Sequence, residues 1–345
     1  MAFNILITSS GGIRSSNLMY QIKKNSIHQP IKIHSTDINQ NIKNRHLVDT
    51  FSKVPSAKQI NYIKKIIKII KKNSVKLIIP GSDEEAVILS KAKKKLNKCG
   101  TDLACVDYKY LKFFKNKIKT YETLDKVKIR KSIWKKVLNT KQLNLAVDKL
   151  TKNKKEVVIK PAFSRGGRNV TIIRNSLKKK IISKNFNRER HMSKNFFFIK
   201  EYKKYLKKFP LIVMERLFDP SYDLDLLAWN GRLIKYVLRR RIGSQGINGN
   251  VIEKNRKIFK TYAEKIAKTF NLSWLYDCDI MLDKDSKPVL MELNPRISGS
   301  LYASLAAGIP LIDDLILLSK NKLNKIKKVN IKKKIIVKPK KNFKI

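Results

Sequence analysis

The feature that most constrains the fold lies near the end of the chain, in residues 276–300, YDCDIMLDKDSKPVLMELNPRISGS. Polar and apolar residues alternate over 277–282, a period of two that predicts a half-buried strand. Residues 283–287 have turn chemistry, Pro288 stands where a strand can begin, and residues 289–293 predict a second strand. We therefore expect a β-hairpin here, packed into a core through its apolar residues.

The same hairpin gathers polar residues on one face. A turn centred within residues 283–287 places Asp279 opposite Glu292, with Asn294 one step further along. Two close carboxylates repel unless a cation lies between them, and oxygen ligands suit Mg²⁺ or Mn²⁺. Arg296 follows, and its guanidinium can bind a phosphate with two parallel hydrogen bonds. The alternative is a surface hairpin with solvated acids; the apolar residues beside these acids favour the metal site.

Charge is the second constraint. The chain has 345 residues, 42% of them hydrophobic, which suits about two to three well-packed domains and not a disordered chain. It carries 78 Lys+Arg against 26 Asp+Glu, a formal net charge of +52 that would attract anionic partners. Much of this charge lies on predicted helix faces. We favour a solvated basic surface over nucleic-acid binding, because neither an aromatic-interleaved basic motif nor helix-turn-helix spacing is present.

The cysteines and the N-terminus indicate a compartment. Cys99, Cys105 and Cys278 are odd in number and lack metal-site spacing, which favours a reducing environment. The N-terminus lacks a basic leader and a long apolar core, and no apolar run approaches the ~20 residues of a membrane span. We expect a cytoplasmic protein.

The first hundred residues predict a Rossmann-like arrangement. A strand over 3–8, the turn Ser9-Ser10-Gly11-Gly12 and a helix over 15–24 form a βα unit; strands over 31–35 and 77–79 and a helix over 59–72 follow. The GxGxxG fingerprint is missing, so a dehydrogenase is not supported. Asp83 is predicted to cap a helix that begins at Glu84.

The middle of the chain predicts a phosphate-binding loop. A strand over 156–161 ends at Lys160, a loop with adjacent glycines follows, and a strand over 170–174 returns. Such a loop exposes backbone N–H groups that can fold over a polyphosphate, although it lacks the GxxxxGK[ST] of a Walker loop. An ordinary glycine hairpin is the alternative. Further on, Arg239, Arg240 and Arg241 follow a strand over 233–238 and either stabilise phosphoryl-transfer charge or form a surface run.

Taken in order, these motifs resemble the ATP-grasp ligases. Glu292-x-Asn294-Pro295-Arg296 with an acid one strand earlier is similar to their metal-binding end, and the nearest likeness is to single-module relatives of the carbamoyl-phosphate synthetase large subunit. The segment 160–167, the run 294–310 (NPR-x-SGS-x(5)-AAG-x-P) and Asn116-Lys117-x-x-Thr120, in a helix predicted over 107–126, carry the rest of the resemblance, which covers roughly residues 1–320.

The resemblance implies an α/β and α+β architecture. It predicts a Rossmann-like pre-ATP-grasp domain (1–106), an ATP-grasp N-terminal lobe with a glycine-rich lid (107–208), a C-terminal lobe with the metal site (209–320) and a lysine-rich tail (321–345).

The resemblance also implies the site. Metal ligands would be Asp279, Glu292 and Asn294, and the catalytic cations Arg296, Lys160 and Arg241. The nucleotide would contact Lys117, Lys160, Ser164, Arg165, Gly166, Gly167, Glu215 and Leu217. The family usually has Glu at the position of Ser221, where it holds the ribose hydroxyls, so this chain departs from the pattern there.

The activity implied is that of an ATP- and Mg²⁺- (or Mn²⁺-) dependent carboxylate–amine ligase. A small-molecule carboxylate would be activated as an acyl phosphate and attacked by an amine or similar nucleophile. One module alone lacks a second phosphorylation site unless a homodimer supplies it. A polyanion-binding or nucleotide-sensing protein on a degenerate ATP-grasp fold is the alternative.

Overall fold

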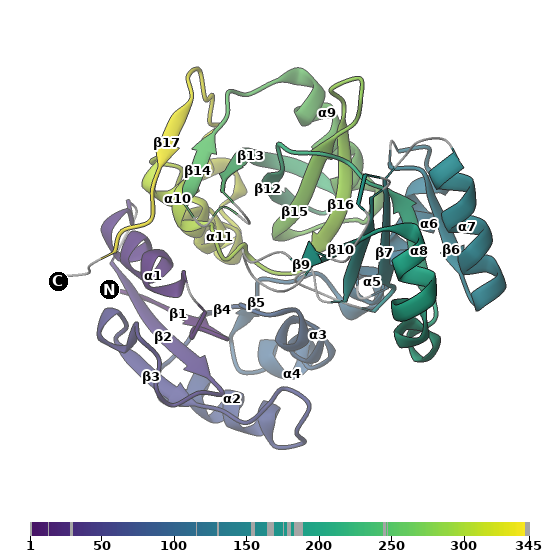
Figure 1. Cartoon of the computed structure of the whole chain (residues 1–345). Coiled ribbons are helices and arrows are strands. Elements are labelled where there is room, and N and C mark those ends of the chain that lie inside the picture. Colours follow the sequence, from purple (N-terminus) through teal and green to yellow (C-terminus); the bar gives the residue numbers. More distant parts are fainter. Residues whose placement is uncertain are drawn as a thin grey trace. The chain divides into compact units, whose positions relative to one another are not determined.

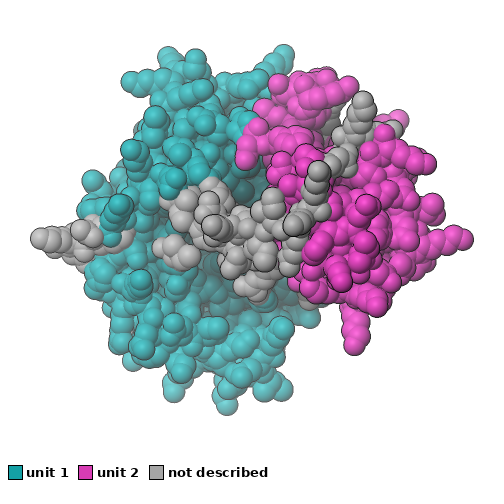
Figure 2. Space-filling model, viewed as in Figure 1, with its two compact units in different colours: residues 1–112, 220–280, 291–345 teal, residues 113–219, 281–290 magenta. Residues whose placement is uncertain are grey.

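The computed structural model describes residues 2–341 except 13, 28–29, 115, 130, 153–155, 164–168, 175, 178–180, 183–188, 244–245 and 247, and describes the backbone alone at 112 and 181–182. The described chain forms two compact units (Figures 1 and 2). Unit 1 comprises Met1–Lys112, Pro220–Ile280 and Met291–Ile345, and unit 2 comprises Phe113–Asp219 and Met281–Leu290.

The N-terminal part of unit 1 is a five-stranded parallel sheet in the order β3-β2-β1-β4-β5. Its strands are β1 (Phe3–Ile7), β2 (Ile31–Asp37), β3 (Thr50–Lys53), β4 (Leu77–Ile79) and β5 (Asp102–Leu103); its helices are α1 (Ser15–Lys24), η1 (Arg45–Leu47), α2 (Tyr62–Lys72), α3 (Asp83–Lys91) and α4 (Lys93–Asn97). The predicted Rossmann-like arrangement is confirmed. The short strands β3 and β5 were not predicted, because they lack the unbroken apolar run that marks the equally short β4.

Two local details of this sheet are informative. The cap of α3 is Ser82, whose hydroxyl accepts a hydrogen bond from the Glu85 N–H at 3.3 Å, so the prediction of Asp83 as the cap was wrong by one residue. The basic residues of α2 are exposed while Ile66, Ile69 and Ile70 are buried, as a solvated basic face requires.

The C-terminal part of unit 1 is a six-stranded sheet in the order β16-β15-β12-β13-β14-β17. Its strands are β12 (Tyr222–Trp229), β13 (Arg232–Ile242), β14 (Gly249–Ile252), β15 (Trp274–Leu282), β16 (Pro288–Asn294) and β17 (Ile335–Val337); its helices are α9 (Lys257–Thr269), α10 (Tyr302–Ala306), α11 (Leu311–Ser319) and η5 (Leu323–Lys325). The predicted hairpin is β15–β16. Strand β13 runs past the predicted end at residue 238 and includes all three arginines. Within the predicted tail, β17 pairs with β14.

One hydrophobic cluster joins the two sheets of unit 1. It includes Ile5 and Met19 from the parallel sheet layer, Leu275 from β15, and Leu311 and Leu315 from α11. Because these residues share a core, the first 112 residues cluster with the C-terminal sheet and not with the intervening segment.

Unit 2 holds a second six-stranded sheet in the order β6-β11-β7-β8-β10-β9. Its strands are β6 (Trp134–Val137), β7 (Val157–Pro161), β8 (Val170–Ile173), β9 (Ile181–Ile182), β10 (Glu189–Met192) and β11 (Leu211–Glu215), with α6 (Lys117–Lys126), α7 (Thr140–Lys152), α8 (Lys194–Phe196), η2 (Phe197–Glu201) and η3 (Tyr202–Lys208).

The single helix predicted over 107–126 is wrong: α5 (Tyr108–Phe114) ends before α6 begins. Asn116 is the cap of α6, and its side-chain oxygen accepts from the backbone N–H groups of Ile118 at 3.0 Å and Lys119 at 3.4 Å. A capping asparagine therefore starts a new helix inside an apparently continuous pattern. Across the described residues, every helix is too short or too polar to cross a bilayer.

Candidate active site

Four carboxylates lie on one face of the C-terminal sheet. Strands β12 and β15 pair so that Asp223 stands opposite Asp279 and Asp225 opposite Asp277. Because side chains alternate along a strand, all four share a face. One oxygen each from Asp223, Asp277 and Asp279 lies within 4.8 Å of the others. Burial and repulsion therefore oppose full ionisation of this trio unless cations lie beside it.

Arg239 supplies one such cation from inside the protein. It stands opposite Asp223 on β13, and its side chain is 0% exposed. It binds Asp225 bidentately, with Nε to Oδ2 at 2.8 Å and Nη2 to Oδ1 at 2.7 Å. Its Nη1 donates to Asp223 Oδ2 at 3.0 Å and to Ser300 Oγ at 2.6 Å. All three guanidinium nitrogens are engaged and the side chain is 0% exposed, so Arg239 supports the sheet and is not accessible to a ligand.

Arg241 occupies the outer edge of the same face. Its Nη2 donates to Asp279 Oδ1 at 2.6 Å, and its Nε donates to Asp223 Oδ1 at 2.9 Å. Arg240 points to the other face, where its Nε donates to Glu253 Oε1 at 2.9 Å. Of the three consecutive arginines, Arg241 alone is both beside the carboxylates and partly exposed.

The residues after β16 complete this face. Asn294 Nδ2 donates to Asp277 Oδ2 at 3.4 Å, and Arg296 Nη1 donates to the same oxygen at 3.2 Å and to the Ile297 carbonyl at 2.9 Å. Arg296 Nε lies 3.2 Å from Asp83 Oδ1, at the start of α3. Both predicted residues therefore contact the carboxylate cluster.

Glu292 lies on the same side, half-buried, and its negative charge contributes to the raised pKa of Asp279. Glu292 is thus near enough to Asp279 for their charges to interact, and Asn294 contacts the neighbouring Asp277. The role of Asp279, Glu292 and Asn294 as metal ligands stays a prediction. Asp223 and Asp277, which form the trio with Asp279, were not predicted as site residues. The period-two pairs Asp223-x-Asp225 and Asp277-x-Asp279 are the signal that could have found them.

The electrostatics differ between the two unpredicted acids. Burial, with repulsion from Asp223 and Asp279, raises the pKa of Asp277 to about 8. Burial acts in the same direction on Asp223, but Arg241 and Arg239 outweigh it and hold the pKa of Asp223 below its ordinary value. Asp277 Oδ1 is buried without a hydrogen-bond partner in the described chain. An oxygen-rich group with an unpaired buried carboxylate oxygen fits a hard divalent cation.

In unit 2, two predicted lysines lie close together. The Lys117 N–H at the start of α6 donates to the Ala162 carbonyl, just past β7, at 3.1 Å. Lys160, near the end of β7, places its Nζ 5.4 Å from the ring centre of Tyr121. The Tyr121 hydroxyl in turn lies 3.9 Å from Met214 Sδ. Both lysine side chains are buried, which is unusual for lysine and indicates a specific environment.

Glu215 has a different surrounding. Its Oε1 accepts from the Ile133 N–H at 2.8 Å. Lys160 stands opposite Ile212, an odd number of residues from Glu215, so strand alternation points Glu215 to the face opposite Lys160. Leu217 follows β11 and is half-buried. The predicted contacts of Glu215 and Leu217 with adenine stay predictions.

The predicted lid residues Ser164, Arg165, Gly166 and Gly167 lie outside the described residues. Ser221, at the position where the resembled family has Glu, is half-buried and accepts from the Arg241 N–H through its carbonyl at 3.0 Å.

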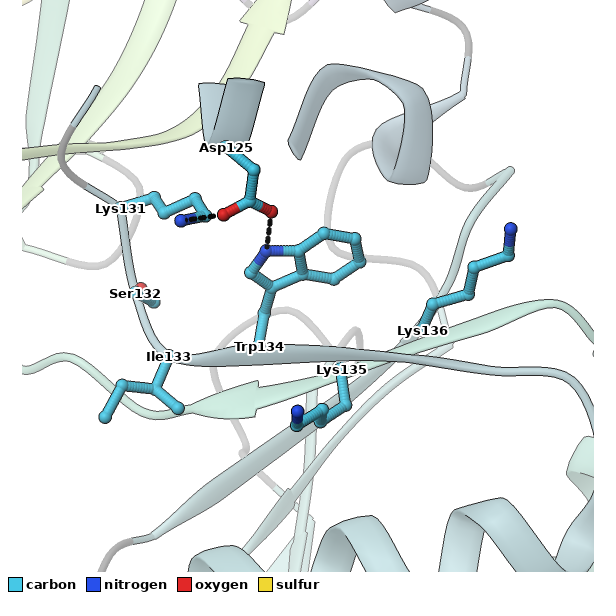
Figure 3. Close-up of a pocket in the computed structure, with 7 residues that line it drawn as sticks. All are labelled: Asp125, Lys131, Ser132, Ile133, Trp134, Lys135 and Lys136. Atoms are coloured by element: carbon cyan, nitrogen blue, oxygen red, sulfur yellow. Dashed lines mark hydrogen bonds and ion pairs between the residues drawn. The ribbon is translucent and has the colours of Figure 1, made fainter. Parts of the chain in front are cut away.

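Unit 2 also has an open surface hollow of about 480 Å³ on the side of β6 (Figure 3). Among its lining residues, Asp125 pairs with Lys131 and accepts from Trp134 Nε1 at 3.0 Å. It is lined by Asp125, Lys131, Ser132, Ile133, Trp134, Lys135 and Lys136. None of these residues belongs to the predicted site, and the acid is already compensated, so we assign the hollow no role.

Two family models match separate parts of the chain. Residues 207–343 match the family model described as ATP-grasp in the biosynthetic pathway with Ter operon, and residues 5–104 match the PylC-like N-terminal domain. The C-terminal part of the chain is thus similar to an ATP-grasp family, and the N-terminal part to a PylC-like domain.

Solved structures agree on the fold. N5-carboxyaminoimidazole synthetase from Staphylococcus aureus matches with a TM-score of 0.65 and 12% identity, over 97% of this chain and 81% of that chain. Biotin carboxylase from Campylobacter jejuni, in a β-γ-ATP complex, matches with a TM-score of 0.63 and 14% identity, over 93% and 71%. L-amino acid ligase from Bacillus licheniformis matches with a TM-score of 0.57 and 13% identity, over 87% and 68%. The sequence matches no curated protein, and nothing in the comparisons supports the nucleic-acid-binding alternative.

Proposed function

We propose that the protein is an ATP-dependent ligase that activates a small-molecule carboxylate as an acyl phosphate for attack by an amine or similar nucleophile. One observation carries this proposal: Asp279, Asn294, Arg241 and Arg296 meet on one face of the C-terminal sheet, within the segment that matches an ATP-grasp family. Named structures with the same fold include a carboxylase, a synthetase and a ligase, two of them with ADP or ATP in the crystal.

The oxygen ligands on this face of the C-terminal sheet suit Mg²⁺, and we propose that Mn²⁺ can take its place. Asp279, Glu292 and Asn294 would hold the ion, with Asp277 beside them presenting a buried oxygen that lacks a hydrogen bond. Such an ion neutralises charge on the β- and γ-phosphates of ATP. Burial and repulsion raise the pKa values of Asp277 and Asp279, and the positive charge of the ion would lower them again.

The cationic residues would act on the transferring phosphoryl group. Arg241 keeps its Nη1 and Arg296 its Nη2 outside the hydrogen bonds that the described residues make, so each retains donors for an anion. Lys160 would also contact the phosphates. A carboxylate oxygen attacks the γ-phosphorus, the bond to the bridging oxygen breaks and ADP leaves. The amine then displaces inorganic phosphate from the acyl carbon and loses a proton to water. Positioning and charge supply the catalysis.

Finer features are part of the same proposal. The run from Asn294 to Pro310 supports a carbamoyl-phosphate-synthetase-like subtype with a single module, in which a homodimer could supply a second phosphorylation site. The three free thiols support a cytoplasmic location.

Calorimetry with MgATP tests the proposal. Wild-type protein is expected to bind only when Mg²⁺ is present, and Glu292→Ala to lose at least about tenfold in affinity, because a charge-assisted contact contributes roughly 1.5–3 kcal/mol. Asp285→Asn, an exposed acid at the turn of the same hairpin, is the control and should bind as wild type does. Amino acids and small carboxylates are then screened for ADP release. Absence of MgATP binding by the wild-type protein would refute the ligase.

A further inference from the structure

The guanidinium of Arg296 is held along two of its edges. Nη1 donates to Asp277 Oδ2 at 3.2 Å and to the Ile297 carbonyl at 2.9 Å, while Nε forms an ion pair with Asp83 Oδ1 at 3.2 Å, without the geometry of a hydrogen bond. The third nitrogen, Nη2, makes no hydrogen bond to any described residue. The side chain is 23% exposed, so this free edge can meet a ligand.

Asp83 comes from the N-terminal sheet and not from the ATP-grasp segment. It is the first residue of α3, directly after the cap Ser82. The same first turn is anchored by Glu85, whose carboxylate accepts from Ser9 Oγ at 2.5 Å and from the Tyr62 hydroxyl at 3.0 Å. The backbone that carries Asp83 is therefore anchored on both sides of the residue.

Two further contacts hold the N-terminal part against the strands that carry the site. The Val106 N–H donates to the Tyr276 hydroxyl at 3.0 Å, and Cys105 Sγ donates to the Pro295 carbonyl at 3.6 Å. Pro295 immediately precedes Arg296. All these residues belong to unit 1, so the contact between Asp83 and Arg296 lies inside one compact unit.

The two acids beside Arg296 are not equivalent. Asp277 also accepts from Asn294 and lies within 4.8 Å of Asp223 and Asp279, so a cation bound at that cluster would draw on its charge. Asp83 lies outside the cluster and is the largest single charge that raises the pKa of Arg296 against the effect of burial. Once a metal is bound, Asp83 remains as the carboxylate that holds the Nε edge.

We propose that Asp83 is a positioning residue for Arg296: by holding the Nε edge from the N-terminal domain, it keeps the Nη2 donors directed at the terminal phosphate of ATP. The N-terminal domain then takes part in the phosphoryl-transfer site directly. This inference rests on the proposed ligase function.

Differential nucleotide binding tests it. Calorimetry measures the affinities for the Mg²⁺ complexes of ADP and of adenylyl imidodiphosphate, which retains a terminal phosphate. Asp83→Asn is expected to weaken the imidodiphosphate about tenfold, the effect of losing one charge-assisted contact, and ADP less than about twofold. Asp83→Glu keeps the charge and should recover part of the loss. In an Arg296→Lys background, Asp83→Asn should have no further effect.

The control is Asp107→Asn, which removes an acid in the same part of the chain that pairs with Lys93 at 2.7 Å and is 56% exposed. It should change neither affinity. Equal weakening of both ligands by Asp83→Asn, or an unchanged ratio of the two affinities, overturns the positioning role while leaving the ligase intact. Failure of wild-type protein to bind either nucleotide refutes the ligase itself. If Asp83→Asn does not fold, as judged by thermal unfolding, the ratio measured for Asp83→Ser decides, because Ser also removes the carboxylate: a wild-type value overturns the inference.

Discussion

Arg239 should be the most structurally demanding of the three consecutive arginines. Replacing it with Met removes a bidentate ion pair and leaves Asp225 and Asp223 buried. Asp225 would keep only its bond from Ser304 Oγ at 2.5 Å, whereas Asp223 would keep Arg241 and Ser300. Removing one partner of a buried ion pair costs about 3–5 kcal/mol, which is a large part of the roughly 5–15 kcal/mol by which a typical domain is stable.

Arg240→Met provides a matched control on the same strand. Arg240 pairs with Glu253 through one contact, and its side chain is 35% exposed, so its loss should cost only about 0–1 kcal/mol. The comparison holds residue type, strand and substitution constant and changes only burial and pairing.

The assay is urea unfolding followed by tryptophan fluorescence in a Trp134→Phe background. The remaining tryptophans, Trp229 on β12 and Trp274 on β15, pack edge to face at 5.1 Å and report on the sheet that holds Arg239. The double variant Asp225→Leu with Arg239→Met should lose less than the sum of the single losses, by about 0.5–3 kcal/mol. Equal destabilisation by Arg239→Met and Arg240→Met would refute the argument that burial and pairing set the cost.

Three further outcomes are expected. Gly81→Ala should lower the free energy of unfolding in urea by about 1–3 kcal/mol, because the added Cβ would lie 2.0 Å from the Thr8 carbonyl oxygen. Gly299→Ala is the control: its Cβ would meet no atom within 4 Å, so the change should stay within about 0.5 kcal/mol. Similar losses in the two variants would contradict this reasoning. His34 is buried, and burial lowers its pKa despite nearby Asp49, so the unfolded chain binds a proton at His34 more readily than the folded chain. The free energy of unfolding should therefore fall as the pH drops below about 6.5. A His34→Gln variant whose free energy of unfolding depends on pH with the same slope would contradict this. Removal of Mg²⁺ with EDTA should weaken ATP binding at least about tenfold in wild-type protein and much less in Asp279→Asn; an equal effect in both would argue against metal binding at Asp279.

Much of the fold could be predicted because its signals are local. Helix α1 has the predicted bounds, and strand β4 does too, since each has a clear period and turn residues at its ends. The break between α5 and α6 was missed because Asn116 is compatible with a helical pattern, and its capping role depends on the backbone conformation it adopts. The extension of β13 through the arginines was missed because charged residues disfavour a buried strand unless partners on other strands neutralise them.

The site was predicted in part for a related reason. Alternation along β15 and β16 decides which residues share a face, so Asp279, Glu292 and Asn294 could be grouped from their positions alone. The alternation of side chains along a strand does not indicate which other strand pairs with it in the sheet. The pairing of β12 with β15 adds Asp223 to the group, and no local pattern encodes that register.

The sequence alone thus carried the resemblance to the ATP-grasp ligases, through the order of its motifs, the acid one strand before Glu292-x-Asn294-Pro295-Arg296, and the Rossmann-like start of the chain. The tertiary structure decided which charges neutralise which. Arg239 and Arg241 are identical in type and lie on one face, yet Arg239 is fully buried against Asp223 and Asp225, whereas Arg241 is 20% exposed beside Asp279. Asp83 and Arg296 are far apart in the chain and meet only because the N-terminal sheet packs on the C-terminal one. Charge interactions depend on distance and burial, and both are properties of the folded chain.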